Sequence, residues 1–348
     1  MWWLEILPKA DQKHQDYDVL VIGAGPAGLM AARKVACEGY SVLMLEKERD
    51  LGIKPCAEAI SESDIAAAEI PASSQFVTNN IDGAYVYPPD ESQSTKIMGK
   101  GYVLNKPLFL YALASKAVSQ GAELFMQGEV REIVLENGRA VAVKYKHKGQ
   151  MLQTSFKILI GADGTGSITS RSCGFERSEY QVIPTIQYVM VNCNIPEKGL
   201  IRLYFGDDVA PKGYAWIFAK NEYAANVGIG TLGSPTKLYL DKFIRNHPAI
   251  FGNAAIIKEG AGLVPVGGRI QTVKENVMLC GDSAGQVVPV TGAGIGTSMT
   301  AGRIAGETAV LTLKADDMSL LNEYPKRYAK IESCIHGDFN MLGGLISY

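Results

Sequence analysis

Apolar and polar positions follow two different patterns along this chain. Early on, mainly apolar runs at residues 18–22, 41–45 and 157–161 have the pattern of parallel strands buried on both faces. Helical stretches at about residues 27–38 and 107–120 alternate with them. Later runs at 185–193, 200–205, 214–220 and 225–232 are rich in aromatic and β-branched residues, as antiparallel strands are. This order predicts an α/β domain that carries a second, antiparallel domain.

The pattern also predicts how the domains divide the chain. Residues 16–84, 105–177 and 269–312 are expected to form a discontinuous first domain, and residues 85–104 and 178–268 an inserted substrate domain. Residues 1–15 are expected to be an N-terminal extension and residues 313–348 a helical C-terminal tail. Asn137-Gly138, between two alternating runs, predicts a tight hairpin within the first domain.

A glycine-rich turn follows the first buried run and has the pattern of a dinucleotide site. Gly23 permits the tight turn, Gly25 lets the backbone approach a pyrophosphate, and Gly28 lets the following helix pack close to the strand. The helix then directs its free N–H groups and the positive end of its dipole at the phosphates. Glu46 ends the second strand, where a carboxylate can accept hydrogen bonds from ribose hydroxyls.

Two more glycine-rich sites follow, each after a buried strand. Asp163-Gly164 lies at the end of one strand, where a carboxylate or a backbone N–H can reach a cofactor. Asp282 follows another strand and is placed to bond a ribityl hydroxyl, although an N-cap role is compatible with this position. Gly294 and Ile295 open a helix whose N-terminus can face the pyrimidine ring of a flavin. Three such sites in this order predict FAD lying across one large domain.

Composition narrows the class of protein. The 348 residues carry a formal net charge of −2 and no basic run, so no nucleic-acid partner is expected. The 6 cysteines lack disulfide or metal-type spacing, which favours reduced thiols, a cytoplasmic protein and no metal site. No stretch resembles a membrane span or a signal peptide. Trp2 and Trp3 either contact a bilayer interface or belong to a short extension.

The three sites in this order resemble the flavoprotein superfamily with the para-hydroxybenzoate hydroxylase fold, and two segments narrow the likeness to the geranylgeranyl reductase family. Residues 55–61, Pro-Cys-Ala-Glu-Ala-Ile-Ser, resemble that family's RCGEGLS loop. Residues 211–220 and 226–230 resemble its PxGYxWxFPK and VGxG sheet motifs. The resemblance covers roughly residues 16–312 and implies a Rossmann-type FAD-binding domain, similar to that of glutathione reductase, with an inserted antiparallel sheet.

The resemblance also implies the cofactor contacts. Carried over by position, they are Ala27, Glu46, Cys56, Ala57, Ala59, Lys106, Val130, Asp282, Gly294 and Ile295. The chain departs from the family at several of these motifs. Ala57 and Ala59 stand where glycine is usual, and Lys106 stands where arginine contacts the phosphates. Pro55 and Ala219 replace an arginine and a proline.

The function implied is FAD-dependent reduction of prenyl-chain double bonds in a lipid or lipid precursor, by hydride transfer from reduced flavin. Electrons are expected from NAD(P)H, a ferredoxin or another carrier, and the lipid substrate implies peripheral contact with a membrane. Two alternatives stay open from the sequence. One is a flavin monooxygenase of the same fold, with a halogenase as a weaker version of it. The other is a catalytically silent flavoprotein that binds prenyl lipid.

Two features have both a chemical and a structural interpretation. Cys56 is either a thiol that helps to protonate or position the substrate, or a small apolar residue in a packed loop. Tyr214, Trp216 and Phe218 share one face of a strand. That face either lines an apolar tunnel for an isoprenoid chain or forms the core of the sheet. The sequence identifies no catalytic residue.

Overall fold

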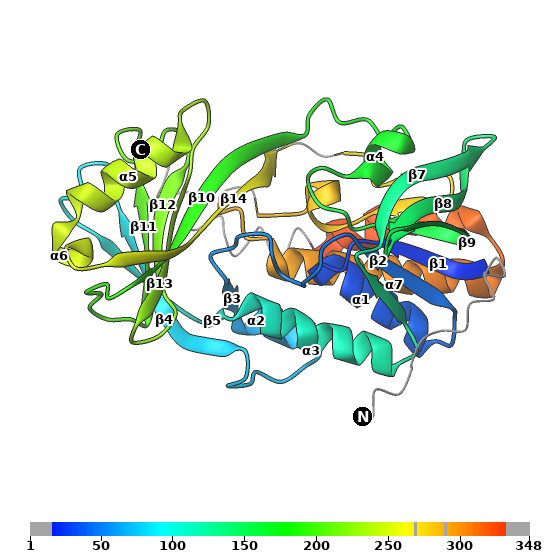
Figure 1. The fold of residues 1–348 in the computed structure, drawn as a ribbon, viewed down its shortest axis with the longest axis horizontal. Coiled ribbons are helices and arrows are strands. Elements are labelled where there is room, and N and C mark those ends of the chain that lie inside the picture. Colours follow the sequence, from blue (N-terminus) through cyan, green and yellow to red (C-terminus); the bar gives the residue numbers. More distant parts are fainter. Residues whose placement is uncertain (1–15, 268–269, 289–290, 332–348) are drawn as a thin grey trace.

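The computed structural model describes residues 16–267, 270–288 and 291–331 (Figure 1). The expected N-terminal extension, with Trp2 and Trp3, lies outside the described residues, and so does the expected tail beyond residue 331.

One of the two sheets, called sheet A here, contains the strands that precede the glycine-rich sites. Its strands are β1 (Asp16–Ile22), β2 (Val42–Glu46), β6 (Glu123–Met126), β7 (Glu129–Glu136), β8 (Arg139–His147), β9 (Gln150–Gly161), β15 (Val273–Lys274) and β16 (Val277–Leu279). The order is β15-β16-β9-β1-β2-β6, and β16, β9, β1, β2 and β6 run parallel. Their carboxyl ends therefore meet along one edge, where ligands bind in folds of this kind.

The two faces of sheet A bury alternate residues of each strand. Val19 and Val21 belong to a core shared with α1 (Pro26–Cys37), α3 (Lys106–Ser119) and α7 (Ile295–Ala315). Leu20 and Ile22 belong to the core under the β7–β8 hairpin. Figure 1 shows the helices and the hairpin on opposite sides of the sheet. The strands are thus buried on both faces, as the sequence predicts.

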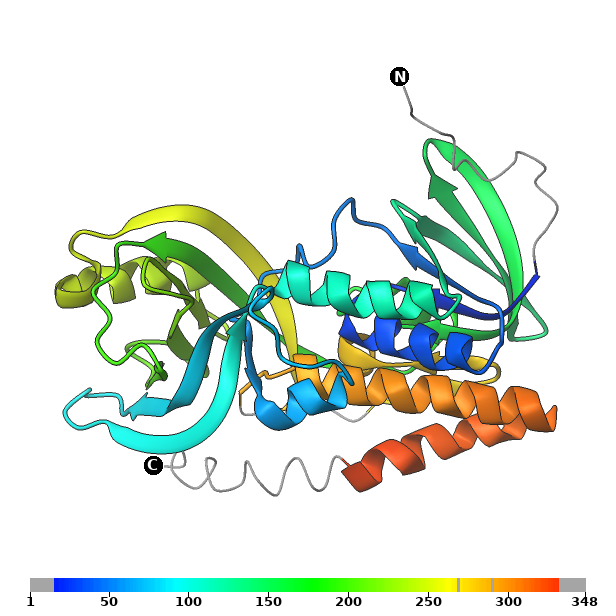
Figure 2. The same cartoon turned by 90° about the horizontal axis from the view of Figure 1, so that it is seen from below.

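The second sheet, called sheet B, forms the other lobe (Figure 2). Its strands are β3 (Ala59–Ser61), β4 (Val77–Tyr87), β5 (Thr95–Leu104), β10 (Gln181–Val191), β11 (Leu200–Phe205), β12 (Tyr214–Ala219), β13 (Ala224–Gly230) and β14 (Ala255–Gly267). The order is β14-β10-β13-β12-β11-β4-β5-β3. Every pairing is antiparallel except that of β4 with β11. Helices α5 (Thr236–Asn246) and α6 (Pro248–Phe251) pack on one face, through Leu240, Phe243 and Phe251.

Short elements connect these layers. They are α2 (Glu62–Ala67), α4 (Ile168–Ser172) and the 3₁₀ helices η1 (Gly281–Ala284) and η2 (Met318–Asn322). The predicted hairpin turn is present, with φ of 50° at Asn137 and 84° at Gly138, as a type I′ turn requires. The predicted strands from residue 185 to residue 232 all occur, with ends that differ by a few residues.

The structure shifts two of the expected boundaries. The boundary at residue 84 falls inside β4, which pairs with β5 and β11 and so belongs to sheet B. Strand β5 makes up the second half of the segment 85–104, and Pro88 and Pro89 lie between β4 and β5. The tail expected from residue 313 begins inside α7, which continues to Ala315. Strand β14 and helix α5 were not predicted.

Candidate functional site

Close packing and backbone conformation within the protein account for two of the three glycines in the turn after β1. A Cβ atom at Gly28 would lie 1.9 Å from the carbonyl oxygen of Gly23, and Gly23 itself has a φ of +98°. Gly25 is different, because its φ is −74° and a Cβ atom there would meet nothing within 4 Å. Nothing in the protein therefore requires glycine at Gly25. Open space beside it is what close approach by a pyrophosphate needs.

Glu46 lies at the mouth of the same turn. Its carboxylate accepts a hydrogen bond from the backbone N–H of Ala24 at 2.8 Å and another from Glu48 at 2.9 Å. The Gly128 N–H donates to the Glu46 carbonyl oxygen at 2.7 Å, which brings the start of β7 alongside. Val130 on β7 has its side chain buried in the core under the hairpin. A cofactor contact at Val130 would therefore come from its backbone.

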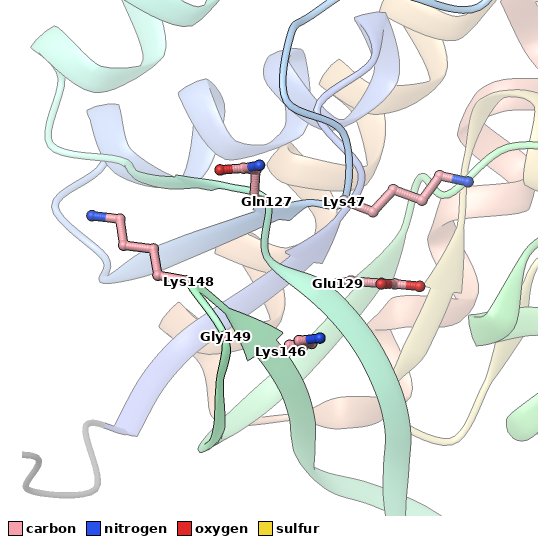
Figure 3. A pocket seen from close by; sticks show the side chains of 6 residues that line it. All are labelled: Lys47, Gln127, Glu129, Lys146, Lys148 and Gly149. Carbon is pink, nitrogen blue, oxygen red and sulfur yellow. The ribbon is translucent and has the colours of Figure 1, made fainter.

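A shallow surface hollow lies next to this end of the site (Figure 3). Its lining residues are Lys47, Gln127, Glu129, Lys146, Lys148 and Gly149. Figure 3 shows the side chains of Lys47 and Lys148 pointing in different directions from separate strand ends. The hollow contains none of the predicted contact residues.

The third glycine-rich site packs directly on the first. A Cβ atom at Gly281 would lie 3.1 Å from Cβ of Ala27, and one at Gly302 on α7 would lie 2.0 Å from the Ala27 carbonyl oxygen. Gly294 is the N-cap of α7 and, as a glycine, offers no side-chain cap; the first backbone bond of the helix runs from Ser298 N–H to the Gly294 carbonyl at 3.0 Å. The N–H groups of Ile295 and the next two residues are thus available to a ligand that takes up negative charge.

The carboxylate of Asp163 holds a neighbouring helix in place, and the cofactor contact expected at this site stays a prediction. One of its carboxylate oxygens accepts from the Ser167 hydroxyl at 2.6 Å, and the other accepts from the backbone and hydroxyl of Thr169 at 2.9 and 3.0 Å. These bonds hold the first turn of α4. Asp282, in contrast, lies at the cofactor edge and accepts from Lys54 Nζ at 2.5 Å, which ties it to the loop before β3. It is not the N-cap of a helix.

Residues 54–59, called the Cys56 loop here, are held by side chains from outside the loop. Lys106, which is buried at the start of α3, donates from Nζ to the Lys54 carbonyl at 2.5 Å. Gln187 on β10 donates to the Cys56 carbonyl at 2.9 Å, and Asn226 on β13 donates to the Ala57 carbonyl at 2.9 Å. Three backbone carbonyls are thus fixed. The Lys106 ammonium thus donates to a backbone carbonyl of the protein, whereas the resemblance implies that the residue at this position contacts a phosphate of the cofactor.

The alanines of the Cys56 loop fit without strain. The left-handed conformation falls on Glu58, with a φ of 70°, whereas Ala57 and Ala59 are not among the described residues with positive φ. The replacement of the usual glycines therefore does not force the backbone into a strained conformation. The Glu58 carboxylate forms an ion pair with Lys220 and accepts from Asn226 at 2.9 Å. Sequence reasoning missed this cluster, although its three residues lie one in each of the segments 55–61, 211–220 and 226–230 quoted above.

An aromatic face of sheet B packs against the Cys56 loop. Trp216 and Phe218 on β12 form one apolar cluster with Ile81, Val103 and Leu203, and Ala57, Ala59 and Tyr214 pack against it. The Tyr214 hydroxyl donates to the Thr291 carbonyl, just before α7. Burial, and to a smaller extent the electrostatic interaction with Cys56, raise the pKa of Tyr214 far above its ordinary value, so this phenol stays neutral. The three aromatic residues do share a face, as predicted.

The residues present fit FAD. The open cradle at Gly25, the carboxylate of Glu46 and the uncapped start of α7 at Gly294 lie along the carboxyl edge of one parallel sheet. They suit a pyrophosphate, a ribose and a flavin ring respectively. The Cys56 loop adjoins this edge through Lys54 and Asp282. Individual contacts to FAD stay a prediction.

This fold and this site define an FAD-dependent oxidoreductase. Two family models match the chain, "FAD dependent oxidoreductase" over residues 18–177 and "Geranylgeranyl reductase catalytic domain" over residues 181–264. The chain belongs to the geranylgeranyl reductase family and is an enzyme with FAD as its cofactor.

Relatives and solved structures agree with this. The chain is 37% identical over 325 residues to digeranylgeranylglycerophospholipid reductase 2 of Methanococcoides burtonii, a match that covers 88% of this chain and 79% of the relative. It is 32% identical over 337 residues to the corresponding reductase of Thermoplasma acidophilum, covering 90% and 83%. A geranylgeranyl bacteriochlorophyll reductase-like protein from Thermoplasma acidophilum has a TM-score of 0.85 at 31% identity, covering 91% and 84%.

A flavin-dependent brominase shares the fold, with a TM-score of 0.75 at 20% identity over 90% of this chain and 84% of the brominase. At this identity the likeness concerns the fold alone. The described helices include none with the length and apolar character needed to cross a membrane.

Proposed function

We propose that the protein saturates carbon–carbon double bonds in the geranylgeranyl chains of a glycerophospholipid. The observation that carries the proposal is the match of residues 181–264, which include the aromatic strand β12, to the geranylgeranyl reductase catalytic domain. The names of the relatives from Methanococcoides burtonii and Thermoplasma acidophilum support the same lipid class.

When bound and reduced, FAD supplies the hydride for such a reduction. The protein's own residues would bind and align the substrate. An isolated alkene is not polarised, so it reacts only when it is held in the correct orientation against the flavin ring. Trp216 and Phe218 are buried in an apolar cluster against which Ala57 and Ala59 pack, so they support the Cys56 loop from behind rather than present an open surface. The start of α7 at Gly294 directs N–H groups at the region where negative charge develops.

The proposal extends to partners. No second nucleotide fingerprint accompanies the three glycine-rich sites, so the electron donor is NAD(P)H bound transiently, a ferredoxin or another reduced carrier. A phospholipid substrate resides in a membrane, so the enzyme works at a membrane surface as a peripheral protein.

An anaerobic reaction tests the function. The FAD-loaded protein is reduced with dithionite, a digeranylgeranyl glycerophospholipid is added, and flavin reoxidation is followed while the lipid is weighed by mass spectrometry. The expected result is reoxidation with a gain of two hydrogens for each double bond reduced, and the control is apoprotein treated in the same way. Flavin that stays reduced until air enters would contradict the proposal and would favour oxygen chemistry. Tight lipid binding without turnover would identify a silent lipid-binding flavoprotein.

A further inference from the structure

Glu58 is an unusual residue at the centre of the Cys56 loop. It is 8% exposed and has a left-handed φ of 70°, a conformation that residues other than glycine seldom adopt. Such a conformation persists only where the surroundings hold it. The bonds that hold Glu58 therefore indicate what the loop is built for.

Three groups from three different elements hold the Glu58 carboxylate. Lys220, directly after β12, forms the ion pair, and Asn226 on β13 donates from Nδ2 at 2.9 Å. The backbone N–H of Lys106, at the start of α3, donates to the other carboxylate oxygen at 3.0 Å. The carboxylate thus joins sheet B to the helical layer of the other lobe. We call Glu58, Lys220 and Asn226 the Glu58 clamp.

The clamp is largely shielded from water. The side chains of Glu58 and Lys220 are 11% and 16% exposed. For a buried pair, removing one charge leaves the other without compensation, which disturbs the local structure more than loss of an exposed pair does. Asn226 reinforces the clamp because the same amide donates to the Glu58 carboxylate and to the Ala57 carbonyl. The position of Glu58 and the path of the Cys56 loop are therefore coupled.

Hydrogen bonds connect the clamp to both preceding residues, Ala57 and Cys56. The Glu58 N–H donates to the Cys56 sulfur at 3.3 Å, and the Glu58 carbonyl accepts from Leu104 N–H at 2.9 Å. Moving Glu58 would therefore move the thiol that precedes it by two residues.

We propose that Glu58 is a positioning residue: through Lys220 and Asn226 it fixes the Cys56 loop and sets how far the Cys56 thiol and the Ala57 backbone extend toward the flavin. The effect of the thiol and loop positions on turnover rests on the proposed function. The effect of the clamp on the Cys56 loop does not. Within the clamp, the opposite charges of Glu58 and Lys220, rather than their side-chain volumes, act together with the two hydrogen bonds from Asn226 to hold the loop.

The test measures access to the Cys56 thiol in the FAD-loaded protein. Maleimide labelling is timed and read by peptide mass spectrometry, with half-buried Cys193 as the internal reference. Glu58→Gln and Lys220→Met are expected to raise the Cys56 rate relative to Cys193 by about tenfold, because each leaves one member of a buried ion pair unbalanced. Both are also expected to shift the visible absorption band of the bound flavin.

Two variants serve as controls. Lys220→Arg keeps the charge and is expected to label at nearly the wild-type rate with an unchanged flavin spectrum. Glu132→Gln breaks the exposed pair with Lys144, 3.0 Å long and remote in sequence from the loop, and is expected to change neither readout. Asn226→Ser removes two bonds without stranding a charge, so it provides a second test should the charge variants fail to fold.

The proposal would be overturned if folded Glu58→Gln kept a Cys56-to-Cys193 labelling ratio within about twofold of wild type, since loss of the clamp must loosen the loop. If Glu58→Gln does not fold, the same result in Asn226→Ser would overturn it. The outcome is separate from that of the lipid assay. If wild type does not reduce geranylgeranyl lipid but the clamp variants still label faster at Cys56, the clamp proposal stands and the proposed substrate is wrong. If wild type reduces the lipid but the clamp variants label at the wild-type rate, the proposed substrate stands and the clamp proposal is wrong.

Discussion

The indole nitrogen of Trp216 donates a hydrogen bond to the side-chain oxygen of Gln187 at 3.1 Å. Both side chains are buried, and the amide nitrogen of Gln187 donates onward to the Cys56 carbonyl at 2.9 Å. The indole therefore determines which way the amide is turned, and the amide holds the loop. This links the aromatic strand β12 to the Cys56 loop through a single side chain.

Replacing Trp216 by Phe is expected to lower the free energy of unfolding by about 1–3 kcal/mol, because it leaves a buried amide oxygen without its donor. Urea unfolding of the FAD-loaded protein measures this. Phe218→Leu is the matched control from the same apolar cluster, since it removes no polar group and is expected to cost less than about 1.5 kcal/mol. Equal losses in the two variants would show that the Trp216–Gln187 bond contributes nothing beyond packing.

The glycines at positions 25 and 28 are predicted to behave differently when each is changed to alanine. Gly28→Ala places Cβ 1.9 Å from the Gly23 carbonyl oxygen, so α1 must move and the apoprotein is expected to lose about 1–3 kcal/mol or more. Gly25→Ala meets no protein atom within 4 Å, so the apoprotein should keep its stability. Both variants should bind FAD weakly.

Thermal unfolding of the apoproteins and FAD titration separate these effects. A Gly25→Ala protein that binds FAD as tightly as wild type would contradict the view that this open space receives the pyrophosphate.

Glu46→Gln is predicted to weaken FAD binding by about ten- to a hundredfold, because bonds from ribose hydroxyls to a charged acceptor are worth roughly 1.5–3 kcal/mol. The glutamine amide oxygen can still accept from the Ala24 N–H, now 2.8 Å from the carboxylate, while the Glu48 N–H loses its acceptor, so the turn after β1 should survive. Fluorescence titration of the apoprotein with FAD gives the affinity. Unchanged affinity in Glu46→Gln would remove this residue from the cofactor site.

Strand type and the glycine-rich sites were predictable because they depend on local pattern. Runs such as Val19–Ile22 are apolar throughout, which is the pattern of a strand buried on both faces. The positive φ at Gly23 is what the tight turn after this strand requires. The aromatic alternation of Tyr214, Trp216 and Phe218 likewise placed three side chains on one face. In each case a few neighbouring residues determine the outcome.

The clamp and the true extent of sheet B were not predictable in this way, since they depend on contacts between distant segments. Glu58 meets Lys220 and Asn226 across more than 160 positions of sequence, with separations of 162 and 168. Strand β4 belongs to sheet B because it pairs with β11 in parallel, which its own sequence does not indicate. The bonds from Ser167 and Thr169 to Asp163 are local, but they too depend on how the chain turns after β9, which the residue types do not specify.

Asp18 is predicted to make the stability of the protein depend on acid pH. Burial alone would raise the pKa of its carboxyl, but Lys157 at 2.8 Å and the Ser41 N–H and hydroxyl at 3.0 and 2.9 Å outweigh burial and lower it. A lowered pKa in the folded state means that the unfolded chain takes up this proton first as the pH falls. The stabilisation is therefore complete above the unfolded pKa of about 3.9 and is lost as the pH falls through the lower folded pKa.

Urea unfolding of wild type and Asp18→Asn at several pH values measures the effect. The difference in unfolding free energy is expected to be constant above about pH 5 and to shrink as the pH falls below about 4. Ser41→Ala removes one of the donors that lower the folded pKa of Asp18, so in this variant the total loss should be smaller, and complete at a higher pH, than in wild type. A gap between wild type and Asp18→Asn that stays constant down to pH values of about 3 would show that the carboxylate has no net favourable interaction in the folded state.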